Sequence, residues 1–122
     1  MPFILDNLEV YLLSEKVGDA IWHKVIKWPL FAKNGIGKQL TAAVDSISAN
    51  IAEGYGRFFV KENINFCFYA RGSLMETKSW IKKARMRNLI DDKEYQLWSE
   101  ELEVIHKKLN GYIKVLKQNA SK

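Results

Sequence analysis

The sequence predicts an all-α protein that folds as an antiparallel up-down-up-down four-helix bundle, with residues 1–122 forming one domain. Three observations lead to this prediction. Apolar residues recur at spacings of three and four, no alternating strand pattern competes, and the only prolines are Pro2 and Pro29. A chain of 122 residues fits one domain. Four helices with short connections favour antiparallel neighbours.

The first two helices are expected over residues 7–28 and 36–53. Pro29 should end the first, because the residue before a proline is pushed out of the helical region. Residues 34–37 are expected to form a turn, and the glycines within residues 54–56 to end the second helix in a left-handed conformation. The apolar residues expected on the buried face of the first helix are Val10, Leu13, Val17, Ile21, Val25 and Trp28. Those of the second helix are Ile36, Leu40, Ala43, Ile47 and Ile51.

The other two helices are expected over residues 60–88 and 91–118. Gly72 lies inside the third, where glycine costs about 1 kcal/mol relative to alanine and indicates close approach of another backbone. Asp91 suits the N-cap of the fourth. The inner face of the third helix is expected to contain Ile64, Cys67, Leu74, Ile81 and Ala84. That of the fourth is expected to contain Tyr95, Trp98, Leu102, Ile105, Leu109, Tyr112 and Leu116.

The net charge of +5 is concentrated in the second half of the chain. Residues 1–60 carry equal numbers of basic and acidic side chains, whereas residues 61–122 carry the whole excess, which permits binding to acidic partners. Cys67 is the only cysteine, so no intrachain disulfide forms, as suits a reducing cytoplasm. The chain has no signal-peptide pattern and no long apolar run. We therefore expect a soluble cytoplasmic protein without a membrane partner.

Enzymatic patterns are weak in this sequence. His23 and His106 are single residues among lysines, without the further ligands that a metal site needs. Cys67 has apolar neighbours, which suits an inert thiol. Glu53 and Glu76 have no nucleophile or oxyanion site beside them. We therefore predict no catalytic residues, metal, cofactor or small-molecule substrate.

The second helix has an outer face with small, nearly uncharged side chains. Asp45 is the only charged residue between Gln39 and Ala52. A helix that is apolar or small on both sides is usually buried on both sides, which favours a subunit contact and a homo-oligomer. The alternative is an exposed alanine-rich face with high helix propensity. The candidate interface residues are Thr41, Ala42, Ala49 and Ala52.

Polar residues border the apolar line of the second helix. They are interpreted as a hydrogen-bonded network that fixes the turn and docks the third helix, since acid matches arginine and amide matches hydroxyl. The alternative is a shared ligand site. The set consists of Ser46, Asn50, Glu53 and Arg57, with Ser73 and Glu76 on the third helix.

The third helix carries the best nucleic-acid candidate, a basic stripe within about 60° of the helix over roughly 21 Å. Such a stripe can follow a phosphate backbone, with Tyr69, Trp80 and Trp98 as stacking faces if exposed. Alternatively, Lys78 and Lys82 pair with Glu100 and Glu103 across an antiparallel hairpin. The stripe consists of Arg71, Lys78, Lys82 and Arg85.

Several motifs together resemble a known family. The chain resembles the four-helix bundle proteins related to those encoded by intervening sequences within bacterial 23S rRNA genes. The resemblance covers nearly the whole chain. Its strongest marks are Gln39-Leu40, Asp45-Ser46-Ile47, Asn50-Ile51-Ala52-Glu53-Gly54-Tyr55-Gly56-Arg57, Ala70-Arg71-Gly72-Ser73-Leu74-Met75-Glu76 and Leu109-Asn110-Gly111-Tyr112.

The resemblance implies an antiparallel four-helix bundle that assembles as a ring-like homopentamer. A related bundle is an accessory subunit of diversity-generating retroelements, where a basic pentamer engages nucleic acid and a reverse transcriptase. Many relatives have paired arginines where this chain has Thr41 and Ala42. If RNA is a partner here, the stripe of the third helix has to make the contact. The alternative function is a protein-interaction scaffold without nucleic-acid affinity.

Overall fold

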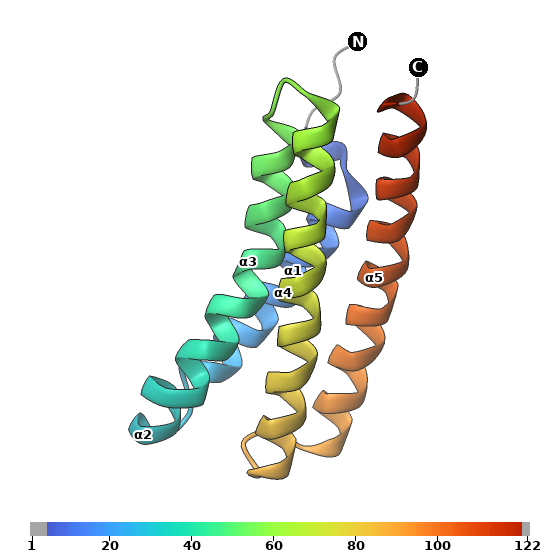
Figure 1. Ribbon diagram of the computed structural model, residues 1–122. Helices are drawn as coiled ribbons and strands as arrows, with labels where there is room; N and C mark the ends of the chain where they lie inside the picture. The colour runs from blue at the N-terminus through green and yellow to red at the C-terminus, as the bar shows by residue number, and fades with distance from the viewer. Residues whose placement is uncertain (1–4, 121–122) are drawn as a thin grey trace.

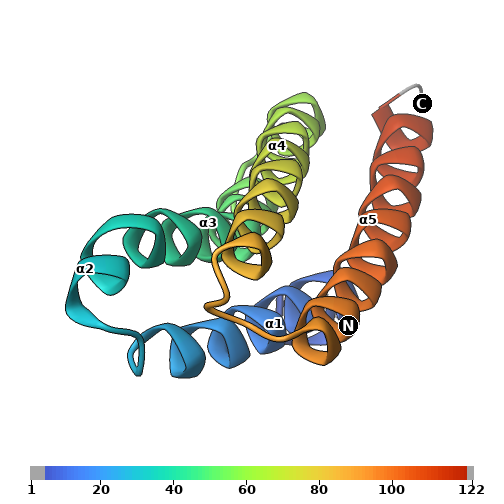
Figure 2. The same ribbon diagram turned by 90° about the horizontal axis from the view of Figure 1, so that it is seen from below.

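The computed structural model describes residues 5–120 and confirms the predicted fold class. Four long helices run alternately in opposite directions along the bundle (Figure 1), and no strand occurs within the described residues. Seen from below, α1, α3, α4 and α5 surround a common centre in that order (Figure 2). The elements are η1 (Leu5–Asn7), α1 (Glu9–Val25), α2 (Leu30–Ala32), η2 (Lys33–Gly37), α3 (Lys38–Tyr55), α4 (Val60–Met86) and α5 (Asp92–Ala120).

The core lies between the four long helices and consists mainly of aliphatic side chains. The most deeply buried of these come from every long helix, because each places apolar residues at spacings of three and four on its inner face. α3 and α4 share the most extensive contact of any pair of elements. Fully buried examples are Ile21, Leu40, Ile47, Ile51, Leu74, Ile81, Leu102, Ile105 and Leu109.

The connection between α1 and α3 differs from the expected turn. Pro29 precedes a short α2, and residues 33–37 form a π-helical turn that leads directly into α3. Gly37 is needed there, because a Cβ at this position would lie 2.7 Å from Cγ1 of Val25 and 3.1 Å from the Ala32 carbonyl oxygen. The tight packing of this segment against the end of α1 therefore fixes its conformation.

The roles expected for two glycines have to be corrected. Gly54 lies within α3 and not in a left-handed cap, since no glycine in residues 5–120 has a positive φ. A Cβ on Gly54 would lie 2.7 Å from Oδ1 of Asn63 and 2.8 Å from Cβ of Phe66, so α4 approaches the α3 backbone here. Gly72, by contrast, faces open space, because a Cβ added there would have nothing within 4 Å. The close backbone approach occurs at Gly54.

The α4–α5 hairpin is closed by two local motifs. Asn88 has a φ of 59°, and the amide of Leu89 donates to the carbonyl of Ala84 at 2.9 Å. This hydrogen bond gives a partner to one of the carbonyls left unpaired in the last turn of α4. Asp91 acts as the predicted cap, because its Oδ1 accepts from the Glu94 amide at 2.7 Å. Glu94 Oε1 in turn accepts from the Asp91 amide at 3.4 Å. These motifs fix the register of α4 against α5.

Candidate nucleic-acid and subunit interfaces

The four basic residues of the predicted stripe lie along the seam between α4 and α5, but most of them have partners. The guanidinium of Arg71 donates to Oδ1 of Asn110 at 2.9 Å, and Lys78 forms an ion pair with Glu103. The pKa of the Glu103 carboxyl is lowered, chiefly by the hydrogen bond from Lys78. Arg71 and Lys78 are therefore less available for binding phosphate than the sequence pattern indicates.

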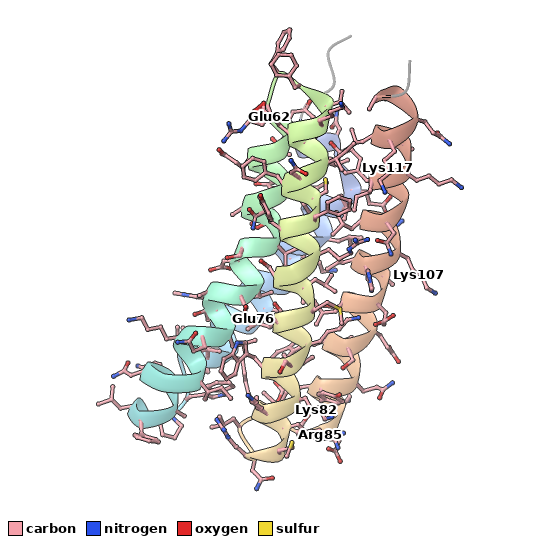
Figure 3. All side chains as sticks on the ribbon, viewed as in Figure 1. Glu62, Glu76, Lys82, Arg85, Lys107 and Lys117 are labelled. Carbon is pink, nitrogen blue, oxygen red and sulfur yellow. The ribbon has the colours of Figure 1, made fainter. Side chains whose placement is uncertain are left out.

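The lower end of this seam is the more accessible part. Lys82 forms no ion pair within residues 5–120, and the expected pairing with Glu100 is replaced by a hydrogen bond from Gln96 to Glu100. Arg85 stacks on Tyr95 at 4.6 Å and lies 3.7 Å from the exposed carboxylate of Asp92. Figure 3 shows Lys82 and Arg85 near the end of α4. Exposed, weakly paired cations of this kind can exchange their partners for phosphate.

The upper end of the seam contains a cation–aromatic cluster that the sequence pattern did not predict. The guanidinium of Arg71 and the ammonium of Lys117 approach the ring of Phe68 at 5.0 and 5.4 Å. The sequence signal was the absence of acidic residues from 104–120, a stretch that contains four lysines. Without the register of the hairpin, Lys117 could not be placed beside Arg71.

The aromatic residues proposed for base stacking differ in exposure. Tyr69 is exposed and packs edge-on against Phe66 at 5.4 Å. Trp80 is half-buried beneath the ammonium of Lys83, and Trp98 belongs to the core. Of the three, only Tyr69 therefore offers a largely exposed ring.

The interhelical network predicted from six polar residues is wrong in its partners. Ser46 and Asn50 donate to the carbonyls of Ala42 and Ser46 in their own helix. Within the part of the chain that the structure describes, no hydrogen bond joins these α3 residues to Ser73 or Glu76. The backbone carbonyl of Ser73 accepts a hydrogen bond from the Thr77 hydroxyl instead, and the carboxylate of Glu76 accepts one from the Trp80 indole. Helical carbonyls and adjacent side chains satisfy these groups more simply than a network between helices.

A different set of residues connects the helices, partly from the quoted motifs (Gly54, Arg71, Asn110 and Tyr112) and partly from outside them. The buried Asn63 donates to the hydroxyl of Tyr112 at 3.1 Å and accepts from the Cys67 thiol at 3.7 Å. Asn63 also packs on Gly54, and Arg71 bonds to Asn110, so α3, α4 and α5 are connected at this level. Gly54, Arg71, Asn110 and Tyr112 thus have a structural role in holding the helices together.

Glu53 and Arg57 form an exposed pair, with Arg57 Nη2 2.7 Å from Glu53 Oε1 and the Glu53 side chain 56% exposed. We expect Glu53→Ala to change the free energy of unfolding by less than about 1 kcal/mol, because an exposed i,i+4 pair contributes little. Chemical denaturation measures this change. A loss well above that value would mean that Glu53 has a buried partner.

The predicted interface on α3 is accompanied by exposed apolar residues elsewhere. Ala42 and Ala49 are exposed and Thr41 and Ala52 are half-buried on its outer face. Two aromatic side chains are almost completely exposed, Phe31 at 95% and Phe58 at 92%. Neither had been predicted from the sequence, because both lie in connections outside the helical periodicity. Large exposed apolar side chains of this kind indicate interaction surfaces.

The structure offers little support for catalysis at the residues considered. Burial raises the pKa of the Cys67 thiol to about 11, which disfavours the reactive thiolate. The His23 ring is bonded to the backbone carbonyl of Asp19 at 2.8 Å. Among residues 5–120, no group of three or more potential ligand side chains could hold a metal ion. In the same range, no helix is long and apolar enough to cross a membrane.

These features define a small antiparallel helical bundle with a basic seam and an apolar outer face. The chain belongs to the 23S rRNA-intervening sequence protein family, whose sequence pattern matches residues 6–111. The fold is similar to that of a protein of unknown function from the S23 ribosomal protein family of Bacteroides thetaiotaomicron, with a TM-score of 0.76 and 24% identity. That alignment covers 86% of this chain and 98% of the other. No curated protein matches the chain, and neither similarity indicates an enzymatic family.

Proposed function

We propose that this protein is a non-enzymatic homo-oligomer that binds RNA through the basic seam between α4 and α5. The observation that carries the proposal is the uneven charge distribution. The seam gathers Arg71, Lys82 and Arg85 on α4, and Lys117 on α5 lies beside Arg71 across the ring of Phe68. A line of cations can follow a phosphate backbone without reading the bases.

Assembly would increase the affinity of such a seam. A single seam with few free cations is a weak site, whereas several copies in one particle can engage one strand together. The small outer face of α3 and the exposed side chains of Leu30, Phe31, Phe58 and Phe59 support a subunit contact. We propose five subunits, the number that the family resemblance implies.

The second candidate function is a protein-interaction scaffold without nucleic-acid affinity. The ion pair between Lys78 and Glu103 favours it, because a cation already paired within the chain contributes less to phosphate binding. The exposed phenylalanines would then bind a protein partner.

Binding of a structured RNA to the wild-type protein at low and raised salt distinguishes the two functions. Phosphate contacts release counterions, so the proposed site predicts measurable binding that weakens steeply and linearly on a logarithmic salt scale. Two RNAs of unrelated sequence should behave alike. Absence of binding at low salt would favour the scaffold.

A further inference from the structure

The outer side of α1 carries an apolar stripe that the bundle does not cover. Leu12, Trp22 and Ile26 are 47%, 46% and 41% exposed. Together with Glu15 and Asp19 they fall within about 80° of the helix, over roughly 21 Å of its length. Three large apolar side chains aligned on one exposed face are typical of an interaction surface.

This stripe borders the small outer face of α3. The hydroxyl of Ser48 on α3 donates to Oε2 of Glu15 on α1 at 3.0 Å. Oδ1 of Asp45 lies 3.2 Å from the position that a Cβ on Gly18 would occupy. α1 and α3 are neighbours in the bundle (Figure 2). The apolar stripe and the exposed Ala42 and Ala49 therefore belong to one surface, which we call the α1–α3 face.

The centre of the α1–α3 face is acidic. It contains the carboxylates of Glu15, Asp19 and Asp45, and none of the three forms an ion pair within residues 5–120. Burial, followed by repulsion from Glu15 and Asp19, raises the pKa of the Asp45 carboxyl. Glu15 and Asp19 therefore disfavour the charged form of Asp45 in the isolated chain, and a cation from a partner would relieve that repulsion.

The second half of α5 has complementary chemistry. Residues 104–120 contain four lysines and no acidic residue. Val104 and Val115 are 45% and 51% exposed, and Lys107 points away from the bundle in Figure 3. On a regular helix, Lys107 and Lys114 lie between these valines along the axis, over about 17 Å, and within about 100° of both in projection. Neither lysine forms an ion pair within the described range. We call this surface the α5 basic face.

We propose that the α1–α3 face binds the α5 basic face of a second copy of this chain, with Lys107 and Lys114 meeting the three carboxylates and the apolar residues packing around them. The inference rests on the oligomer in the proposed function and specifies its contact. The two faces differ, so the contact is heterologous and repeats from copy to copy into a ring or a filament. It leaves Lys82 and Arg85 outside the contact.

A charge exchange tests this pairing. One variant carries Asp19→Lys and Asp45→Lys, and the other carries Lys107→Glu and Lys114→Glu. Each variant alone brings like charges together, so light scattering should give the 14.2 kDa mass of a single chain. A chain with all four substitutions has both faces reversed and should recover the wild-type mass. An equimolar mixture of the two variants should form particles larger than one chain, because each supplies the face that the other needs, but strict alternation cannot close a ring of five.

The matched control carries Glu62→Lys and Glu76→Lys, the same change of charge on α4 (both residues are labelled in Figure 3). It should keep the wild-type mass. Thermal unfolding checks that every variant folds, and Asp19→Lys alone replaces the first variant if Asp45→Lys disturbs its contact with Gly18. The pairing is wrong if the single-face variants keep the wild-type mass, or if the fourfold variant stays monomeric. If the wild-type protein is itself monomeric, the homo-oligomer of the proposed function is wrong.

Discussion

Gly54→Ala is expected to reduce the free energy of unfolding by about 3 kcal/mol, the upper part of the range for overpacking a core. The added methyl group would lie 2.7 Å from Oδ1 of Asn63, 2.8 Å from Cβ of Phe66 and 3.0 Å from the Asn63 carbonyl oxygen. The last two atoms cannot rotate away, so α3 and α4 would have to separate. Denaturant unfolding monitored by circular dichroism measures the loss.

Gly72→Ala is the matched control for that substitution. Gly72 also lies within a long helix, but nothing within 4 Å would meet its added methyl group. Alanine should therefore stabilise the helix by about 1 kcal/mol through its higher helix propensity. Equal effects of the two substitutions would contradict the close approach of α4 at Gly54.

Replacing Lys82 and Arg85 together with glutamine should weaken RNA binding to a similar extent for unrelated sequences. Each lost phosphate contact should also reduce the logarithmic salt slope by about one. Stability should change little, because Lys82 has no ion-pair partner within residues 5–120 and Arg85 faces an exposed carboxylate. Filter binding over a salt series measures both affinity and slope.

Lys27→Gln with Lys38→Gln removes the same charge from exposed positions outside the seam and serves as the control. It should reduce affinity less than the seam variant and leave the salt slope nearly unchanged. Equal losses in the two variants would mean that net charge, and not the seam, determines binding. Early unfolding of the seam variant would show that these side chains stabilise the hairpin.

The long helices could be predicted from the sequence because their apolar periodicity and their breakers act locally. Asp91 marked the start of α5 correctly, whereas α1 ends at Val25, three residues before the end expected at Trp28. The segment 33–37 could not be predicted, because its π-helical form depends on how Gly37 packs against Val25. The role of Gly54 likewise depends on the position of α4, which the sequence of α3 does not contain.

The candidate sites were harder to predict because side-chain partners depend on register between helices. The ion pair of Lys78 with Glu103 could be foreseen from the short hairpin, whereas Lys82 and Glu100 do not pair. The bond between Asn63 and Tyr112 joins residues 49 positions apart, beyond the reach of local patterns. Helical periodicity also gave no reason to expect exposed aromatic side chains in the connections.

The mass of the wild-type protein in solution tests the central claim most directly, since both the repeated RNA site and the contact between the two faces require assembly. Light scattering at micromolar concentration should give five times the 14.2 kDa chain mass. Ala49→Lys should lower that mass, because a cation on the outer face of α3 would repel the lysines of the α5 basic face on the next copy. A wild-type mass of 14.2 kDa throughout the micromolar range would contradict the account.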